Sequence, residues 1–408
     1  MAGEGTAGLE MGSSQIRCLV GEVRNDQSVS ILGYGEVPSR GIRKGEILNR
    51  DEAMVAVRSA LKLAEKNTRK SIHSVVLVLS GGDASCVVSK GEHRIADADE
   101  NRKVEISADD VEEVLQIARR HTLPENRIRL HSVTSSFSVD DIQEVVKPVG
   151  LSCEVLRADV LTLHGKRSVV DNFQKLVADV PVVCADAVYG GMGSAWAVTN
   201  EAIRSAGVLV IDIGGGTTDY ALYDHTILRR AGTITVGGAH LTNDVAKGLQ
   251  IPEAQAEALK VKEGSALSNL MERDRNISIP SDTHGFNGKM VRAVTLNTIL
   301  QARMEEIFEL VKADVERYLL NKPLGGGVLL TGGGAFLEGS RDLAQKIFNM
   351  PCSMGKPMDV HGLPSSQAGP FYAPLIGAIR YTASLERRVE NPSWLGRMVR
   401  VAWGDRNA

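Results

Sequence analysis

Two short segments of the chain share a residue pattern suited to holding an anion. In residues 8–16 (GLEMGSSQI) and 208–223 (VLVIDIGGGTTDYALY), an apolar run ends at an acidic residue, and Gly with Ser or Thr follows before apolar residues return. This pattern predicts a strand, a tight turn and a second strand. Glycines let the turn bring bare N–H groups close to phosphate oxygens. One such hairpin is most often only a turn, but two copies indicate two similar half-domains that face each other across one nucleotide.

The acidic residues that end the two runs, Glu10 and Asp212, suit a hydrated Mg²⁺, which usually keeps several waters and takes few protein oxygens. Hydroxyl groups in the turns add further contacts to phosphate. The predicted phosphate-binding residues are Gly12, Ser13, Ser14 and Gln15 in the first hairpin and Gly214, Gly215, Gly216, Thr217 and Thr218 in the second.

A third glycine cluster follows an apolar strand pattern in residues 328–348, ahead of an amphipathic helix. Backbone without side chains lets a flat base or ribose lie against it. Glu257 and Lys260 fall near one face of another predicted helix; alternatively, they are solvated surface charges, which are common on helices. The remaining predicted nucleotide contacts are Gly237, Gly238, Gly332, Gly333, Gly334 and Ala335.

The ordered set resembles the ATPase superfamily that contains actin, sugar kinases and heat-shock chaperones, and the match runs along nearly the whole chain. The resemblance implies that Glu10 and Asp212 hold Mg²⁺ through water and that the two hairpins clasp the β- and γ-phosphates of ATP. It also implies that the 332–334 glycines border the adenosine, that Glu257 reaches the ribose, and that Lys260 reaches the base or the phosphates.

Residues 85–160 indicate a particular branch of that superfamily. They predict a helix over 109–121, with Ser107 as its N-cap and acidic residues in its first turn, followed by two strands. This insert resembles that of the FtsA family of bacterial cell-division proteins, as do the opening GLEMGSSQIRCLVGEV and the segment PSRGIRKGEI. Two positions depart from the family pattern: Thr134 stands where proline is expected, and Gln15 where a phosphate-facing lysine is usual.

The expected fold class is α/β. It is a two-domain actin-like ATPase fold with ribonuclease-H-like halves around a nucleotide cleft, an FtsA-type insert subdomain and a C-terminal amphipathic helix. The 408 residues are enough for two such domains, each with its own core. The predicted divisions are 1–84 and 161–206 for the first actin-like domain, 85–160 for the insert, 207–240 and 315–385 for the second domain, 241–314 for a small lobe of the second domain, 386–393 for a short linker, and 394–405 for the amphipathic helix.

Composition favours a cytosolic protein. The net charge of −3 gives no reason to expect nucleic-acid binding. The N-terminus lacks the pattern of a signal peptide, and no segment approaches the roughly twenty apolar residues of a membrane span. Five scattered cysteines without metal-type spacing predict buried thiols in a reducing compartment: Cys18, Cys86, Cys153, Cys184 and Cys352.

The last eighteen residues predict a helix that lies on a membrane. Apolar residues form one helical stripe, arginines lie away from it, and the hydrophilic segment ERRVENPS precedes it. The alternative is a terminal helix docked on its own domain, but two tryptophans and three arginines in so short a piece favour the membrane interface. The predicted membrane contacts are Trp394, Leu395, Met398, Val399 and Trp403.

The sequence offers no clear catalytic base. In the superfamily, a carboxylate or glutamine in the helix before the second hairpin positions the attacking water. The corresponding segment here is CADAVYGGMGSAWAV, where that place aligns near Gly190. Asp186 lies about one helical turn away and is predicted to cap the helix or lie on the surface. We therefore expect ATP and Mg²⁺ to bind and hydrolysis to be slow at most, with the catalytic residues unknown.

The resemblance implies a division protein at the inner face of the cell membrane, at the division site. It would form filaments, lie on anionic lipid and tether the ring of the tubulin-like protein FtsZ, whose C-terminal peptide would dock on the small lobe, and later division proteins would join. Lys289, Arg292 and Arg303 are candidates to take that acidic peptide, or else are ordinary surface charges. Two alternatives stay open: a type IV pilus assembly adaptor of related fold, and a sugar-kinase-like phosphotransferase.

Overall fold

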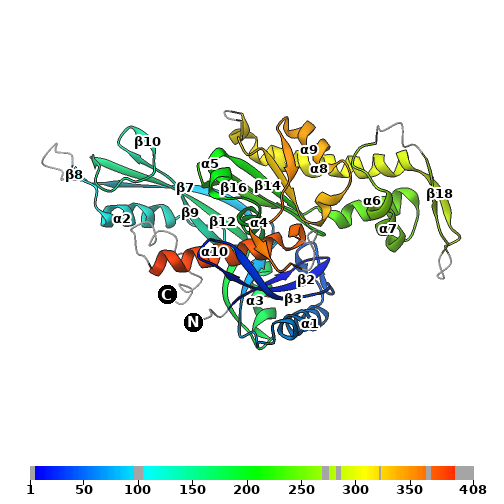
Figure 1. Ribbon diagram of the computed structural model, residues 1–408. Coiled ribbons are helices and arrows are strands. Elements are labelled where there is room, and N and C mark those ends of the chain that lie inside the picture. The colour runs from blue at the N-terminus through cyan, green and yellow to red at the C-terminus, as the bar shows by residue number, and fades with distance from the viewer. Residues whose placement is uncertain are drawn as a thin grey trace.

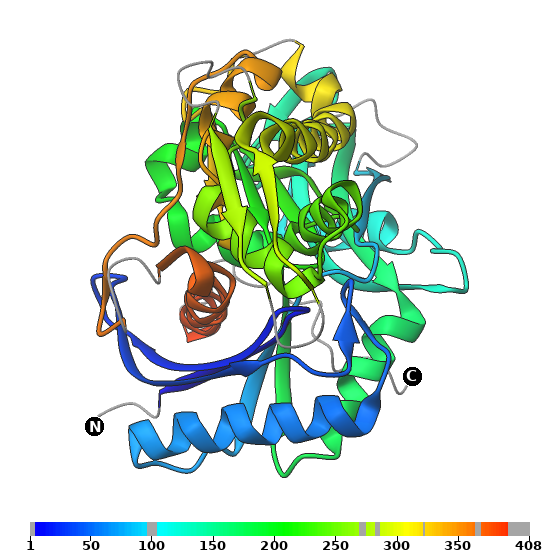
Figure 2. The same cartoon turned by 90° about the vertical axis from the view of Figure 1, so that its right-hand side faces the viewer.

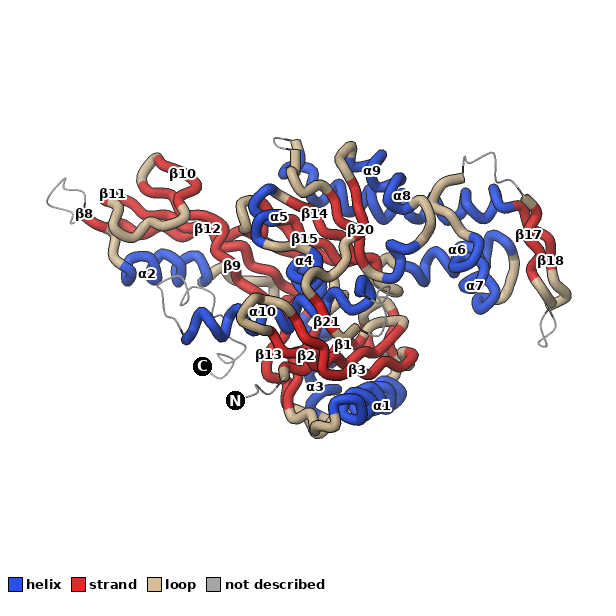
Figure 3. Tube along the Cα trace, in the orientation of Figure 1, coloured by secondary structure: helices blue, strands red, loops and turns tan. Residues whose placement is uncertain are grey.

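Two β-sheets with helices on their faces build the body of the protein (Figure 1). The computed structural model describes residues 5–95, 104–268, 275–281, 286–320, 323–363 and 369–390. An insert extends from one end of this body and a small lobe from the other, as the tube in Figure 3 shows. Figure 2 shows the first sheet between two helices, α1 (Arg50–Thr68) on one face and α10 (Ala373–Glu390) on the other.

The first sheet has six strands. β1 pairs antiparallel with β2 and parallel with β6, so a hairpin is followed by a crossover. Helices α3 (Arg167–Ala178) and α4 (Gly190–Val198) belong to the same half, and a small β4–β5 ribbon (Ile42–Arg43, Glu46–Ile47) lies between β3 and α1 in sequence. The strand order is β13 (Val183–Tyr189), β6 (Ser74–Leu79), β1 (Thr6–Met11), β2 (Gln15–Val23), β3 (Val29–Pro38) and β21 (Val360–His361).

The second sheet repeats this pattern with five strands. β14 pairs antiparallel with β15 and parallel with β19, and all six residues of β14 are buried, as expected for an apolar central strand. Helices α5 (Glu201–Ala206), α8 (Ala293–Leu319) and α9 (Ser340–Phe348) accompany it. The order is β16 (Ile227–Ile234), β15 (Thr218–Asp224), β14 (Val208–Ile213), β19 (Val328–Thr331) and β20 (Cys352–Met354).

The insert has its own core between a four-stranded sheet and α2 (Ala108–Arg119). Ser107 caps this helix as expected: its side chain accepts from Asp110 N–H, and the Asp110 carboxylate accepts from Ser107 N–H. One strand extends past the predicted end of the insert at residue 160, because β12 continues to Lys166 alongside β9. The strands are β7 (Ser85–Arg94), β8 (Val104–Glu105), β9 (Arg127–Val139), β10 (Ile142–Val145), β11 (Ser152–Cys153) and β12 (Val155–Lys166).

The small lobe consists of α6 (Gly238–Leu249), α7 (Glu253–Glu263), the β17–β18 ribbon (Asn276–Ile279, Lys289–Arg292) and the start of α8. The predicted boundary at residue 314 falls inside α8, because this 27-residue helix runs from the lobe onto the second sheet. The lobe and the second sheet share one apolar core.

Helix α10 corrects the predicted position of the linker. α10 extends to Glu390, so the first five residues of the predicted 386–393 linker are helical. The segment SLERRVE has neither Gly nor Pro to stop a helix, and the first proline comes at Pro392. The predicted membrane helix at 394–405 lies outside the described residues. Within the described part of the chain, no helix combines the length and apolar character needed to cross a membrane.

α10 packs closely against α4 through a pair of glycines. A Cβ on Gly377 would lie 1.6 Å from the carbonyl oxygen of Gly193, so only glycine allows this crossing. The same helix covers β1 and β2. α10 therefore packs against both the first hairpin and α4.

Candidate nucleotide-binding site

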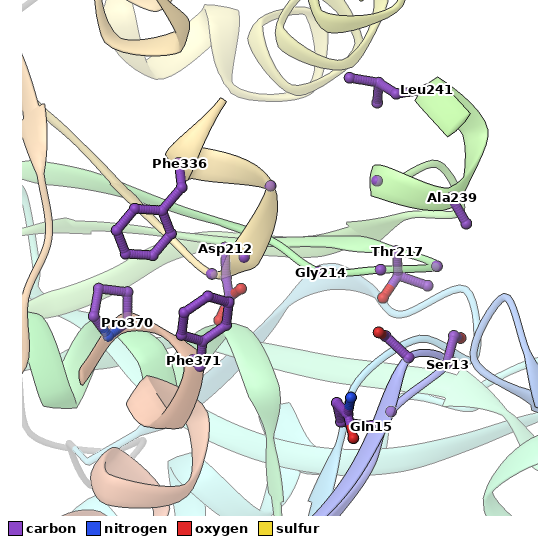
Figure 4. A pocket seen from close by; sticks show the side chains of 18 of the residues that line it. Ser13, Gln15, Asp212, Gly214, Thr217, Ala239, Leu241, Phe336, Pro370 and Phe371 are labelled. Atoms are coloured by element: carbon purple, nitrogen blue, oxygen red, sulfur yellow. The ribbon is translucent and has the colours of Figure 1, made fainter. Parts of the chain in front are cut away.

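A cavity of about 540 Å³ lies between the two halves, and the two hairpins and the third glycine cluster line it (Figure 4). It brings together most of the predicted nucleotide contacts from five separate parts of the chain. Those that line it are Glu10, Gly12, Ser13, Ser14, Gln15, Asp212, Gly214, Gly215, Gly216, Thr217, Gly238, Glu257, Lys260, Gly332, Gly333 and Gly334.

Three of the predicted nucleotide contacts are buried next to the cavity but do not line it. Thr218 is buried and donates from Oγ1 to Val236 O at 2.8 Å. A Cβ on Gly237 would lie 2.6 Å from Gly214 O, so this glycine supports the second turn from behind. Ala335 is also buried, on the 3₁₀ turn η2 (Gly333–Phe336). These residues shape the site rather than face its interior.

The two hairpins have the same turn. Gly12 N–H donates to Gln15 O at 3.1 Å, and Gly214 N–H donates to Thr217 O at 2.9 Å. The turns also touch each other across the cavity, because a Cβ on Gly215 would lie 2.9 Å from Ser14 Cβ. Glycine is thus needed at 215 for the approach of the two halves as well as for an approaching anion.

Buried carboxylates of both halves gather at the floor of the cavity. Burial raises the pKa of Asp212 to about 8; a hydrogen bond donated by Ser194 Oγ opposes this shift, and the charges of Asp219 and Glu10 add to it. Burial also raises the pKa of Glu10, although the nearby Arg17 guanidinium lowers it. Glu10 Oε2 has no hydrogen-bond partner in the described structure. A cation would satisfy this oxygen and relieve the repulsion, so the residues fit a Mg²⁺ ion held through water.

Asp219 is a cavity residue that the sequence analysis missed. It lines the cavity from β15 and accepts hydrogen bonds from Thr233 Oγ1 and from Tyr189 OH. Burial raises its pKa to about 6. Asp219 follows Thr218 directly, so its position in the second motif was the available signal.

Arg17 is the second missed residue. It lies two residues after Gln15 on β2 and lines the cavity with it, because alternate residues of a strand share a face. Its Nη1 lies 3.7 Å from Glu10 Oε2 and its Nη2 lies 3.4 Å from Glu36 Oε1. The positive charge that Gln15 lacks therefore comes from the next residue on the same face of the strand.

An aromatic pair closes the other end of the cavity. Phe336 and Phe371 stack with ring centroids 5.2 Å apart and planes 17° apart. A Cβ on Gly333 would lie 2.9 Å from Phe371 Cε1, so the glycine cluster lies against an aromatic ring. Gly332 has a positive φ of 81°, and a Cβ there would meet the Asp212 carboxylate. Neither phenylalanine was predicted, because their meeting depends on residues far apart in sequence.

Lys260 and Glu257 form part of the wall of the cavity. Lys260 Nζ donates to Gly238 O at 3.1 Å, to Thr242 Oγ1 at 2.8 Å and to Glu257 Oε2 at 2.6 Å. The Lys260 side chain is only 13% exposed, whereas Glu257 is 51% exposed. Lys260 is therefore not a solvated surface charge.

The expected position of Asp186 was wrong. Asp186 lies in strand β13, not in a helix, and its carboxylate accepts from Ala187 N–H at 2.7 Å. The segment VCADAVY, apolar except for Asp186, pairs with β6 as a strand, and the helix α4 begins only at Gly190. A Cβ on Gly190 would lie 3.1 Å from Asp219 Oδ2. The carboxylate beside the expected catalytic position is thus Asp219.

The three basic residues proposed for partner binding do not form a joint surface of unpaired charge. Arg303, on α8, donates from Nε to Asp244 Oδ2 at 2.6 Å and also pairs with Glu306. Lys289 Nζ donates to Leu249 O at 2.8 Å. Arg292 ends β18. The predicted membrane contacts at 394–403 lie outside the described residues.

Comparison with known proteins places these features in a family. The sequence pattern described as "Cell division protein FtsA" matches residues 209–377, and that of the "SHS2 domain inserted in FTSA" matches residues 81–164. FtsA of Pseudomonas aeruginosa is 30% identical over 380 residues, covering 93% of this chain and 89% of that protein. FtsA of Escherichia coli strain K12 is 30% identical over 408 residues, covering 96% of each.

Solved structures confirm the expected actin-like α/β fold. A chain of the PilM–PilN type IV pilus biogenesis complex superposes with a TM-score of 0.63 at 16% identity, covering 92% of this chain and 97% of that one. MreB5 of Spiroplasma citri bound to ADP superposes with a TM-score of 0.55 at 15% identity, covering 95% and 99%. At these identities the likeness shows the actin-like fold alone. The sequence relatives go further, and with 30% identity to cell-division proteins over more than nine tenths of its length, the chain belongs to the FtsA family.

Proposed function

We propose that this protein binds ATP with Mg²⁺ between its two halves, polymerises at the inner face of the cytoplasmic membrane and tethers the FtsZ ring there. The main evidence for nucleotide binding is that the two glycine hairpins meet across one cavity whose floor contains buried carboxylates. Family membership supports the role in division. An MreB5 structure bound to AMPPNP shares the fold, which supports a nucleotide in the cavity.

The residues of the cavity divide the work of binding. Mg²⁺ would neutralise phosphate charge, and Glu10 and Asp212 would hold it through water. Backbone N–H groups of the two turns would receive the phosphates, with hydroxyls from Ser13, Ser14 and Thr217. The glycine cluster and the two stacked phenylalanines would receive the adenosine.

Slow hydrolysis remains part of the proposal. Asp219 is the carboxylate placed to orient a water, but Thr233 and Tyr189 already donate to it. Asp186 does not line the cavity. We expect Asp219→Asn to reduce the slow turnover and Asp186→Asn to leave it unchanged, measured as phosphate release under ATP saturation.

Tethering and membrane attachment are tested together with vesicles. Purified protein is mixed with anionic vesicles, ATP, Mg²⁺ and FtsZ, and the material that floats with lipid is measured. The parent should float and recruit FtsZ, whereas Trp403→Glu should release both. Gly404→Glu is the matched control, because it adds the same charge on the side of the predicted helix opposite the apolar stripe and should not matter. Equal flotation of Trp403→Glu and the parent would contradict the anchor.

The docking site is tested by charge reversal on the lobe. Lys289→Glu and Arg292→Glu should reduce FtsZ recruitment while the protein itself still floats. Arg303→Glu should also break the ion pair with Asp244. A loss of FtsZ recruitment by this variant is therefore evidence for the docking site only if its melting temperature equals that of the parent. Full recruitment by all three variants would move the docking site elsewhere.

The family relationship favours this function over the two alternatives. The likeness to the pilus protein is structural and stands at 16% identity, whereas the FtsA relatives reach 30% over most of the chain. A protein that binds ATP but never FtsZ would favour a pilus adaptor. Rapid phosphate transfer to a sugar would favour a phosphotransferase.

A further inference from the structure

Arg17 connects the polar end of the cavity to the start of α10. Beyond its pairs with Glu10 and Glu36, its Cζ lies 5.8 Å from the ring centroid of Phe371 and 5.6 Å from that of Tyr372. Tyr372 OH donates to Glu36 Oε2 at 2.5 Å, which closes the network. Both aromatic residues belong to the 3₁₀ turn η3 (Gly369–Tyr372), which leads directly into α10. One side chain therefore touches both Glu10 and the base of this helix.

The hydrogen bonds of this network are incomplete. In the described structure, Arg17 Nε and Glu10 Oε2 are buried without a hydrogen-bond partner, and so is Gln15 Oε1 beside them. Arginine has five N–H donors, and a buried donor or acceptor without a partner costs free energy. An anion would accept a hydrogen bond from the free arginine N–H, and a cation would pair with the free carboxylate oxygen. A polyphosphate bound together with a divalent cation supplies both.

The other cations of the cavity wall are differently placed. Lys260 uses its three donors on Gly238, Thr242 and Glu257. Lys262 is 82% exposed and lies 3.9 Å from Glu263. Arg17, whose side chain is 13% exposed, is the buried cation with an unused donor among the described residues that line the cavity.

We propose that Arg17 has two positions, one that neutralises Glu10 when no nucleotide is bound and one that contacts the phosphates when Mg²⁺ takes its place at Glu10. The proposal rests on the nucleotide function proposed above. In the second position Arg17 withdraws from Phe371 and Tyr372 and loosens η3. The charge of the bound nucleotide thereby reaches the first turn of α10.

Calorimetry tests the phosphate contact. Arg17→Met should weaken binding of ATP with Mg²⁺ by about tenfold to a hundredfold, the usual effect of losing a charge-assisted hydrogen bond, and Arg17→Lys should recover part of the loss. Adenosine, which has no phosphate, should bind Arg17→Met and the parent equally. Arg341→Met is the matched control, because Arg341 is 58% exposed on α9 and pairs with the adjacent Asp342. Equal affinity of Arg17→Met and the parent for ATP with Mg²⁺ overturns the proposal.

Hydrogen exchange tests the connection to α10. ATP with Mg²⁺ should speed amide exchange at residues 369–372 in the parent, and Arg17→Met should show fast exchange there with or without nucleotide. Tyr372→Phe, which removes only the bond to Glu36, should speed exchange and should not weaken ATP binding, because the contacts that Arg17 must leave are already loosened. Unchanged exchange in the parent on adding ATP and Mg²⁺ overturns the connection.

A negative result can arise from misfolding of a variant, from the absence of nucleotide binding or from the absence of the Arg17 contact, and these causes can be told apart. Should Arg17→Met fail to melt cooperatively, Arg17→Lys carries the calorimetry and Tyr372→Phe carries the hydrogen exchange. Parent-like ATP affinity of Arg17→Lys together with parent-like exchange in Tyr372→Phe overturns the proposal. A parent that does not bind ATP with Mg²⁺ at all removes the proposed nucleotide function and this inference together. If the parent binds ATP with Mg²⁺ and the Arg17 variants bind it equally well, only this inference is removed.

Discussion

The two halves of the protein repeat one strand pattern but contribute different chemistry to the cavity. Both hairpins close their turn with the same glycine hydrogen bond. The first presents charged and polar side chains, among them Glu10, Gln15 and Arg17, whereas the second presents three consecutive glycines after Asp212. The first half therefore contributes mainly charged and polar side chains to the cavity, whereas the second contributes mainly glycine backbone, called the cradle below. Variants in each half can break or sharpen that distinction.

The cradle should be the most sensitive part. Gly215→Val would place side-chain atoms against Ser14, because even a Cβ there lies 2.9 Å from Ser14 Cβ. We expect ATP affinity to fall by about a hundredfold, the upper end of the ~1–3 kcal/mol cost of overpacking. Calorimetry measures the affinity, and a melting curve shows whether the halves still fold. Retained affinity would show that the hairpins move apart without cost.

The carboxylate of the cradle should matter chiefly through the metal. Asp212→Asn keeps the size of the side chain and its contact with Ser194, but removes the charge that would hold hydrated Mg²⁺. The affinity for ATP in the presence of Mg²⁺ should fall by about tenfold to a hundredfold, as for other groups that hold a metal indirectly. Titrations with EDTA in place of Mg²⁺ should show little difference from the parent. A large loss in EDTA would point to a structural role instead.

Single hydroxyls of the first half should matter less. Ser13 Oγ accepts from Gly45 N–H at 3.0 Å, so Ser13→Ala leaves that donor without its partner. The expected loss of ATP affinity is about fivefold, corresponding to ~1 kcal/mol for one hydrogen bond. Ser39→Ala, outside the cavity lining, is the comparison variant. If Ser13→Ala costs as much as Gly215→Val, the proposed division between side chains and cradle is wrong.

An effect of similar size to that of Ser13→Ala concerns how the insert joins the first half. His131 on β9 accepts from Tyr189 N–H at 3.0 Å, and burial lowers its pKa to about 4. The unfolded chain, with a pKa near 6.5, binds the proton first, so the stabilisation is complete above pH 6.5 and is lost as pH falls toward 4. Between pH 7 and 5.5 the free energy of unfolding should fall by about 1 kcal/mol. His131→Gln should lack this part of the pH dependence in denaturant titrations.

Local patterns were sufficient to predict much of the fold and part of the site. The two hairpins, the third glycine cluster and the helix after Ser107 follow from residue order within a few positions. The contact between Arg17 and Phe371 was missed because it joins segments more than three hundred residues apart. Asp186 was misplaced because its short, almost wholly apolar strand, which leads directly into α4, was interpreted as part of that helix. The partner of Arg303, Asp244, likewise comes from another helix and was not visible in sequence.

The glycine contact between α4 and α10 has a mechanical consequence. Because α4 and α10 are in such close contact at Gly193 and Gly377, we expect a rotation of α4 to be passed on to α10. Ser194, next to Gly193 on α4, holds Asp212 at the cavity floor. The 18 residues of α10 span about 27 Å. A rotation of about 5° at the cavity would then displace the far end of a helix this long by roughly 2 Å, at the point where residues 391–408 begin.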